Sequence, residues 1–191
     1  MAQEVVLLRH GQTEWSESLR HTGRTDIPLT EEGERQAERA RKILRGRSFA
    51  LVLTSPLQRA AETCRLTGFG DVAQVREDLR EWDYGDYEGL KTAEIREQVP
   101  GWTVFRDGVP NGETVEEVGA RLDRVIEEAR AADGNVLLFG HGHSLRILTA
   151  RWLGLDPRDG RLFALDPATL SVLSYERETA VVRRWNRDLS Y

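Results

Sequence analysis

Hydrophobic positions along the chain fall into short apolar runs separated by longer stretches of mixed polarity. Three runs, at residues 4–8, 49–54 and 135–140, are rich in Val, Leu and Phe. Continuous apolar runs of this length are typical of strands that are buried on both faces of a sheet. We therefore expect these three segments to lie side by side as the centre of one sheet.

Helices are predicted between these strands by capping residues and by apolar positions at helical spacing. A threonine cap followed by glutamates predicts a helix over residues 30–44. Ser55-Pro56 has the order of an N-cap followed by proline in the first turn, so a helix is expected to begin there. Thr114 opens a capping box before an amphipathic stretch, and a further helix is expected over 144–153.

The remaining segments give weaker signals. Residues 72–75 suggest a short strand, 82–89 a loop rich in aromatic and acidic side chains, and 92–98 a short helix. Two β-rich runs at 171–176 and 180–185 predict a terminal hairpin. Strands that alternate with helices indicate an α/β fold, with one sheet between two layers of helices. No repeat or linker interrupts residues 1–191, so we expect a single domain.

Composition narrows the function. The 191 residues are 39% hydrophobic and 31% charged, with a net charge of −5, which argues against a nucleic-acid-binding surface. No apolar stretch reaches membrane-spanning length, and Met1-Ala2-Gln3-Glu4 does not resemble a signal peptide, so a cytoplasmic protein without membrane contact is expected. The single cysteine, Cys64, rules out an internal disulfide and is expected to be a small core residue.

Two histidines follow two of the predicted strands. Arg9-His10-Gly11 comes directly after the first apolar run, and His141 lies between glycines after the third. Strand ends at the carboxyl edge of an α/β sheet are where such folds place their chemistry. A histidine nucleophile must be neutral, with its second ring nitrogen hydrogen-bonded so that the tautomer is fixed. The arginine beside His10 points to a phosphate bound between the two histidines.

Two further residues fit chemistry on a phosphate. Arg59 lies at the start of the helix after the second strand, and a guanidinium group binds phosphate oxygens in pairs of hydrogen bonds. Glu81 precedes the aromatic and acidic loop. A nearby phosphate dianion favours the protonated form of a carboxyl group, which could then donate a proton to a leaving oxygen. Taken singly, each of these residues could equally be an ordinary surface or core residue.

Together these motifs resemble the histidine phosphatase superfamily, with the phosphoglycerate-mutase-like fold. The resemblance rests on Arg9-His10-Gly11 and on four further blocks, at residues 22–37, 54–63, 79–89 and 140–143. The blocks occur in family order across nearly the whole chain. The family fold is a three-layer α/β/α sandwich.

The resemblance implies a role for each matching residue. His10 would become phosphohistidine, with Glu81 as proton donor. Arg9, Arg59 and His141 would hold the phosphate. No metal or diffusible cofactor is expected. Positions that contact a small phosphorylated substrate in relatives match Gln12, Ser16, Thr22, Gly23, Tyr84 and Gly142.

Within the family, several segments resemble sedoheptulose-bisphosphatase-type enzymes and bacterial broad-range acid phosphatases. Phosphoglycerate mutases carry basic residues after the donor glutamate, where this chain has Trp82-Asp83. A metal-independent phosphomonoesterase acting on sugar phosphates or bisphosphates is therefore predicted. Two alternatives stay open: a cofactor-dependent phosphoglycerate mutase and a non-catalytic protein that binds phosphorylated ligands. The terminal hairpin also offers an edge for pairing in a homodimer.

Overall fold

A six-stranded sheet forms the centre of the computed structural model, which describes residues 2–189. Strands β1 to β4 are parallel to one another, and the strand order across the sheet is β3-β2-β4-β1-β5-β6. The parallel strands are β1 (Val5–Arg9), β2 (Leu51–Thr54), β3 (Gln74–Val75) and β4 (Val136–Gly140). The three predicted apolar strands are thus adjacent, with β4 between β1 and β2.

The terminal hairpin completes the sheet on the other side of β1. Strand β5 (Leu170–Glu176) pairs antiparallel with β1, and β6 (Thr179–Arg187) pairs antiparallel with β5. Arg177 turns the chain between them with a positive φ of 55°. Strand β6 forms one edge of the sheet. A homodimer through this edge stays a prediction.

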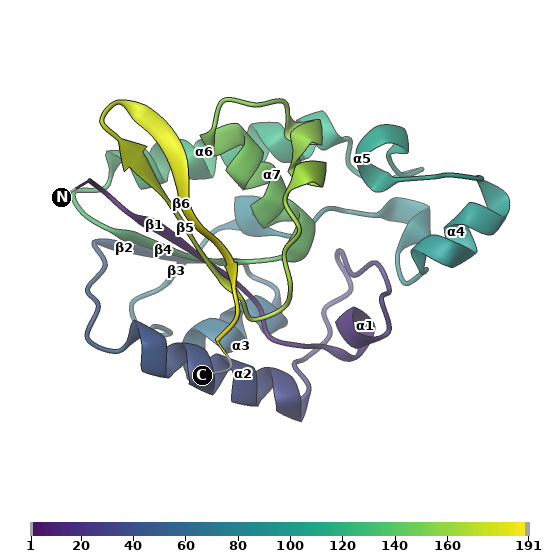
Figure 1. Cartoon of the computed structure of the whole chain (residues 1–191). Coiled ribbons are helices and arrows are strands. Elements are labelled where there is room, and N and C mark those ends of the chain that lie inside the picture. The colour runs from purple at the N-terminus through teal and green to yellow at the C-terminus, as the bar shows by residue number, and fades with distance from the viewer. Residues whose placement is uncertain (1, 190–191) are drawn as a thin grey trace.

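Helices cover both faces of the sheet and make the predicted three-layer α/β/α sandwich (Figure 1). Helices α2 (Glu31–Leu44) and α3 (Gln58–Leu66) lie on one face, and α6 (Val115–Ala131) and α7 (Gly142–Trp152) on the other. Alternate residues of β1 divide between the two layers, as the pleat of a strand requires. Val5 and Leu7 pack in the cluster that contains α6 and α7 residues, and Val6 and Leu8 in the cluster of α2 and α3.

The helix after β2 begins later than its sequence predicts. Helix α3 starts at Gln58, and its N-cap residue Leu57 makes no side-chain cap. Ser55 does not occupy the N-cap position; its hydroxyl oxygen accepts a hydrogen bond from Leu57 N at 3.3 Å and contacts the imidazole of His141 at 2.7 Å. The predicted caps of α2 and α6 are confirmed: Thr30 accepts a hydrogen bond from Gly33 N, and Thr114 forms the capping box.

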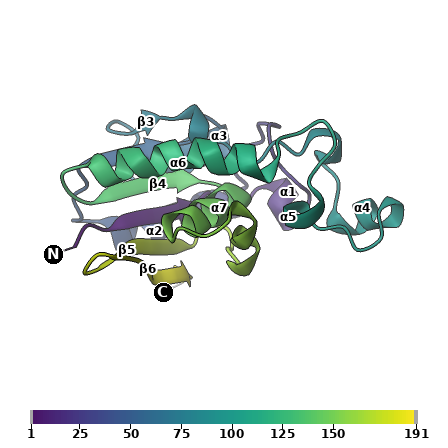
Figure 2. The ribbon, with the colours of Figure 1, turned by 90° about the horizontal axis from the view of Figure 1, so that it is seen from above.

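Smaller elements gather beyond the carboxyl ends of the parallel strands (Figure 2). They are the helices α1 (Glu14–Glu17), α4 (Thr92–Gln98) and α5 (Val104–Asp107), and the 3-10 segments Glu77–Leu79, Gly85–Tyr87 and Pro157–Leu162. Only α4 was expected from the sequence. The helices α1 and α5 have four residues each, too few for a periodic pattern.

Two other expectations concern burial and the membrane. Cys64 is buried, and burial raises the pKa of its thiol to about 12, which fits an unreactive core residue. Within residues 2–189, no helix is long and apolar enough to cross a membrane. The cytoplasmic location stays a prediction.

Candidate active site

His10 follows the last residue of β1 and is almost fully buried, with 5% of its surface exposed. Its Nδ1 lies 2.7 Å from the carbonyl oxygen of Gly11. Because a carbonyl group only accepts, Nδ1 carries the proton and the lone pair is on Nε2. Burial, followed by the positive charges of Arg59 and Arg9, holds the pKa of His10 well below its usual value. The ring is therefore neutral near pH 7, with a nucleophilic Nε2.

His141 lies beside His10, with 5.2 Å between the ring centroids. It follows β4 and is fully buried. Its Nε2 contacts Ser55 Oγ at 2.7 Å, and that oxygen also accepts a hydrogen bond from Leu57 N at 3.3 Å. The Ser55 hydroxyl proton is thus free to be donated to Nε2, which leaves the proton of neutral His141 on Nδ1. Among the described residues, that Nδ1 has no partner.

Two arginines flank the histidines from separate elements. Arg9 ends β1 and donates from one terminal nitrogen to the carbonyl oxygen of Leu165. Arg59 on α3 is fully buried, and its terminal nitrogens donate to the carbonyl oxygens of Thr22, Gly23 and Thr25 at 2.9–3.1 Å. The Nε atoms of both arginines are buried and have no partner within residues 2–189.

Glu81 lies opposite, at the N-terminus of α7. Its Oε1 accepts hydrogen bonds from Trp82 N at 2.9 Å and Ser144 N at 2.8 Å, and its Oε2 accepts one from His143 N at 3.0 Å. A carboxylate suits this position because the first N–H groups of a helix have no partner within the helix. Oε1 accepts two hydrogen bonds and Oε2 only one, so Oε2 is the oxygen better able to accept another.

A cavity of about 110 Å³ lies between these groups. Residues predicted from the sequence that line it are Arg9, His10, Ser16, Thr22, Glu81, Tyr84 and Gly142. Gly142 allows Arg9 to approach closely, because a Cβ atom there would lie 3.3 Å from the guanidinium carbon. The cavity is a size that suits one phosphoryl group with the first atoms of its leaving group.

Comparisons with known proteins give the family of the chain. A sequence model of the histidine phosphatase superfamily (branch 1) matches residues 5–188. The chain belongs to the histidine phosphatase superfamily. It is 40% identical to the acid phosphatase of Mycobacterium tuberculosis, over 93% of this chain and 91% of that one. It is also 40% identical to sedoheptulose 1,7-bisphosphatase of Saccharomyces cerevisiae, over 78% of this chain and 67% of that one.

Further relatives include a mutase and another phosphatase. A 2,3-bisphosphoglycerate-dependent phosphoglycerate mutase of Mesorhizobium japonicum is 36% identical over 84% of each chain. The solved structure of a mycobacterial glucosyl-3-phosphoglycerate phosphatase in complex with VO3 has a TM-score of 0.87 and 31% identity, covering 97% of this chain and 99% of that one. The fold expected from the family resemblance is thereby confirmed.

Four residues that the family resemblance places at the phosphate or substrate do not line the cavity. Arg59 and His141 are fully buried and are not among its lining residues, although the His141 ring lies 5.2 Å from the ring of His10. Gln12 faces α2 instead, where its Oε1 accepts a hydrogen bond from Thr30 at 2.8 Å. Gly23 is packed closely: a Cβ atom there would lie 2.4 Å from the carbonyl oxygen of Trp82. A glycine at this position lets the loop pack closely against the backbone of Trp82.

The side chains of Trp82 and Asp83 also face away from the cavity. Trp82 is buried and donates from Nε1 to the Glu113 carbonyl oxygen at 2.8 Å, and Asp83 pairs with Arg24 at 2.9 Å. The expected aromatic and acidic wall is therefore not part of the site. Arg20 and Arg146 line the cavity together with Arg9.

Two more histidines in the cavity were not singled out from the sequence. His143 Nδ1 lies 2.5 Å from the hydroxyl group of Tyr84, and the His21 ring packs on Tyr84 at 4.9 Å between centroids. Burial lowers the pKa of His21 to about 4 and holds that of His143 well below its usual value. Both rings are therefore neutral near pH 7. Nothing in their local sequence signals this, because the burial comes from segments far apart in the chain.

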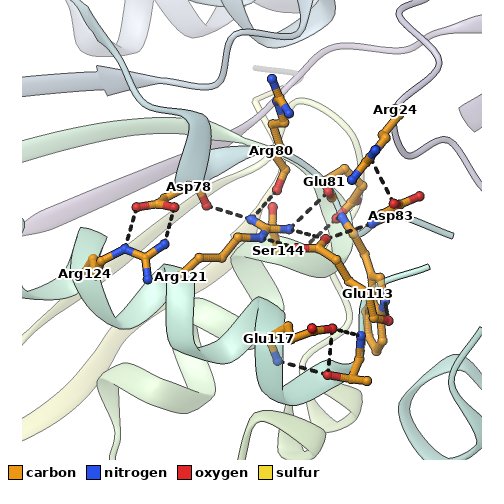
Figure 3. A network of polar contacts seen from close by, with 12 residues as sticks. Arg24, Asp78, Arg80, Glu81, Asp83, Glu113, Glu117, Arg121, Arg124 and Ser144 are labelled. Carbon is orange, nitrogen blue, oxygen red and sulfur yellow. Dashed lines mark hydrogen bonds and ion pairs between the residues drawn. The ribbon is translucent and has the colours of Figure 1, made fainter. Parts of the chain in front are cut away.

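Arg121 on α6 holds the backbone around Glu81 (Figure 3). Its guanidinium group donates to the carbonyl oxygens of Asp78 at 2.7 Å, Arg80 at 2.8 Å and Glu81 at 3.1 Å. It also forms a two-pronged ion pair with the Glu113 carboxylate, at 2.8 and 3.0 Å. The five bonds connect α6 to the segment that carries the glutamate, so Arg121 positions Glu81 without touching the cavity.

Proposed function

We propose that this protein is a metal-independent phosphomonoesterase that hydrolyses small phosphorylated metabolites through a phosphohistidine on His10. One observation carries the proposal. His10 is neutral, its ring lies 5.2 Å from that of His141, and the charges of Arg59 and Arg9 act on it; each of these three neighbours has a buried side-chain nitrogen without a partner within residues 2–189. A buried donor without an acceptor costs about 1–3 kcal/mol, so this group of donors is suited to receive an anion. A phosphate accepts several such bonds at once.

The positive charge of the two arginines does what a metal ion does in other phosphatases, since phosphoryl transfer needs mainly positioning and charge stabilisation. Gly142, which lines the cavity, brings its backbone to the same place, while the next two N–H groups of α7 bind the Glu81 carboxylate. The Nδ1–H of His141 adds a neutral donor. We therefore expect activity to survive exhaustive chelation.

The residues support a two-step displacement. His10 Nε2 attacks phosphorus, the ester P–O bond breaks, and the leaving oxygen takes a proton held on Glu81 Oε2. Water then attacks the phosphohistidine while Glu81 takes the proton from it. The N–P bond breaks, inorganic phosphate leaves, and neutral His10 is restored. Ser16, Thr22 and Tyr84 line the cavity where the substrate would contact them.

The relatives support sugar phosphates as a substrate class, because two of them are named for a phosphorylated sugar and a phosphorylated glycosyl compound. Return of the phosphoryl group to an organic acceptor is the second candidate. The mutase relative favours it, and Arg20 and Arg146 provide cations that could bind a phosphoglycerate carboxylate. Release to water is favoured by the higher identity to the two phosphatases.

The test combines trapping with product analysis. Wild-type protein quenched during turnover of ³²P-labelled substrate should carry an acid-labile, alkali-stable phosphate, and His10→Ala should carry none and lose nearly all turnover. With 3-phosphoglycerate, ³¹P NMR should show inorganic phosphate. Conversion mainly to 2-phosphoglycerate would show that the protein is a mutase and not a hydrolase. An active His10→Ala variant would refute the phosphohistidine.

A further inference from the structure

A second, larger groove opens from the catalytic cavity. It has a volume of about 860 Å³, against about 110 Å³ for the cavity itself. The two share five lining residues, which mark the boundary between them: Arg9, Ser16, Arg20, His21 and His143. A phosphate held at His10 would fill the inner cavity, so the leaving group of an ester must extend into this groove.

Backbone pairing between residues 20–21 and 89–91 places Lys91 next to the boundary residues. His21 N donates to the Leu90 carbonyl oxygen at 2.9 Å, and Gly89 N donates to the His21 carbonyl oxygen at 2.8 Å. Arg20 and Lys91 form an antiparallel bridge in the same pairing. Lys91 is thereby held one residue from the bonds to His21, on the wall of the groove.

Helix α4 forms the outer wall. It follows Lys91 directly and buries Ile95 on one side, while its other side lines the groove. Thr92 joins this wall to the boundary, because its hydroxyl group lies 3.3 Å from His21 Nε2. Arg96 follows one turn later and donates from Nε to the Trp102 carbonyl oxygen at 2.9 Å, which fixes its direction. Figure 2 shows α4 beyond the carboxyl end of the sheet.

The charges of this wall are unbalanced. Within residues 2–189, neither Lys91 nor Arg96 forms an ion pair. Arg20 has a loose partner, Glu94 at 3.9 Å, and Glu97 is the single acid that lines the groove. A local excess of positive charge is notable in a chain whose net charge is −5. Leu19, which is 77% exposed, and Ala93 supply the apolar part of the lining.

We propose that Lys91 and Arg96 form a subsite for a second anionic group, phosphate or carboxylate, at the far end of the leaving group. The preferred substrate is then a phosphate monoester whose leaving group is a hydroxylated carbon chain ending in an acid. The boundary residues suit the middle of such a chain, because His21 and His143 are neutral hydrogen-bonding rings. This inference rests on the proposed hydrolase function and adds its selectivity.

Matched substrate pairs test the subsite. Fructose 1,6-bisphosphate is compared with fructose 6-phosphate, and 3-phosphoglycerate with glycerol 3-phosphate, so that each pair differs by one far anion. Lys91→Gln and Arg96→Gln should each raise KM for the doubly anionic member by roughly five- to tenfold and change the other member less than about twofold. The phosphate pair and the carboxylate pair distinguish the two sources of the anion.

The chain offers matched controls for both variants. Its other lysine, Lys42, and the nearby Arg41 lie at the carboxyl end of α2 and line neither the cavity nor the groove. Lys42→Gln and Arg41→Gln should leave every KM unchanged. Equal effects of Lys91→Gln on both members of each pair, or no effect on either, would overturn the subsite.

A second measurement does not depend on turnover. On the His10→Ala variant, acetylation by acetic anhydride followed by mass spectrometry should show Lys91 protected by fructose 1,6-bisphosphate, with Lys42 modified as without ligand. Lack of protection at Lys91 would overturn the proposal even if hydrolysis is efficient. Protection in a wild type that hydrolyses no ester would uphold the subsite and instead reject the hydrolase function.

Discussion

The five hydrogen bonds that connect Arg121 to Glu113 and to the segment carrying Glu81 allow a specific test of Glu81 as the proton donor. The perturbation is Arg121→Lys, which keeps the positive charge and removes the planar fork. A single ammonium group cannot reach the Glu113 carboxylate and three separate carbonyl groups together, so at least two of the five hydrogen bonds are lost. Because Arg121 does not line the cavity, we expect its effect on the reaction to come through Glu81.

The expected loss of stability follows from the burial of the Arg121 side chain. The Arg121 side chain is 10% exposed, and each buried carbonyl left without a donor costs about 1–3 kcal/mol. We expect the free energy of unfolding to fall by about 2–4 kcal/mol, which a domain of ordinary stability survives. A displacement of about 1 Å at a reacting group can cost about a hundredfold in rate. Turnover of an alkyl phosphate, which needs the proton, should fall by about that factor.

The assay compares glycerol 3-phosphate with 4-nitrophenyl phosphate, whose leaving group needs no proton. Arg121→Lys should slow the aryl ester less than about threefold, and Glu81→Gln should show the same contrast. Adding Arg121→Lys to Glu81→Gln should cause little further loss, because the donor is already gone. Arg124→Lys is the control, since Arg124 lies on the same helix and, within residues 2–189, pairs only with the half-buried Asp78 carboxylate.

Two results would refute the reasoning. Equal losses on the alkyl and aryl esters would mean that Arg121 supports the site as a whole and not the proton donor. Multiplicative losses in the double variant would mean that Arg121 and Glu81 act independently. Circular dichroism and urea unfolding on each variant separate both results from simple loss of folded protein.

Further predictions concern the buried histidines, Ser55 and Gly11. The pKa values of all four histidines are lower in the folded state, so the unfolded chain binds protons first and the free energy of unfolding decreases as the pH falls below 6.5; the four rings (His10, His21, His141, His143) predict a decrease of up to about 5 kcal/mol per pH unit between pH 6 and 5. Urea unfolding at pH 7, 6 and 5 measures this, and a flat profile would contradict it. Ser55→Ala should lower kcat about tenfold with a small change in Tm, because it removes the support of the His141 tautomer and otherwise only the long hydrogen bond from Leu57 N; unchanged kcat would argue against that assignment. Gly11→Ala should reduce soluble protein strongly, as its Cβ would lie 2.4 Å from the Gly33 carbonyl oxygen; normal expression and Tm would show that the loop can move.

Much of this arrangement could be predicted from the sequence, because its signals are local. Apolar runs identified β1, β2 and β4, and capping threonines identified α2 and α6, since strand burial and helix caps depend on a few neighbouring residues. His10 and His141 could be singled out because each follows a strand, and Arg59 because it lies at the start of a helix, whereas the role of Glu81, which lies in a loop, came from the family resemblance. The order of the strands, with β4 inserted between β1 and β2, depends on long-range packing and is not encoded in any one segment.

The parts that could not be predicted are contacts between distant segments, and Ser55 shows why. By local rules it is a helix N-cap, but the structure uses its hydroxyl group to orient His141, 86 residues away, and α3 begins without a side-chain cap. The same holds for His143, whose neutrality comes from burial against Tyr84 and Phe105. A motif thus names the ring that is present, while its protonation and tautomer depend on partners that only the folded chain brings together. Because these partners determine which ring nitrogen carries the proton, substitutions of the partners probe the mechanism more specifically than substitutions of the histidines themselves.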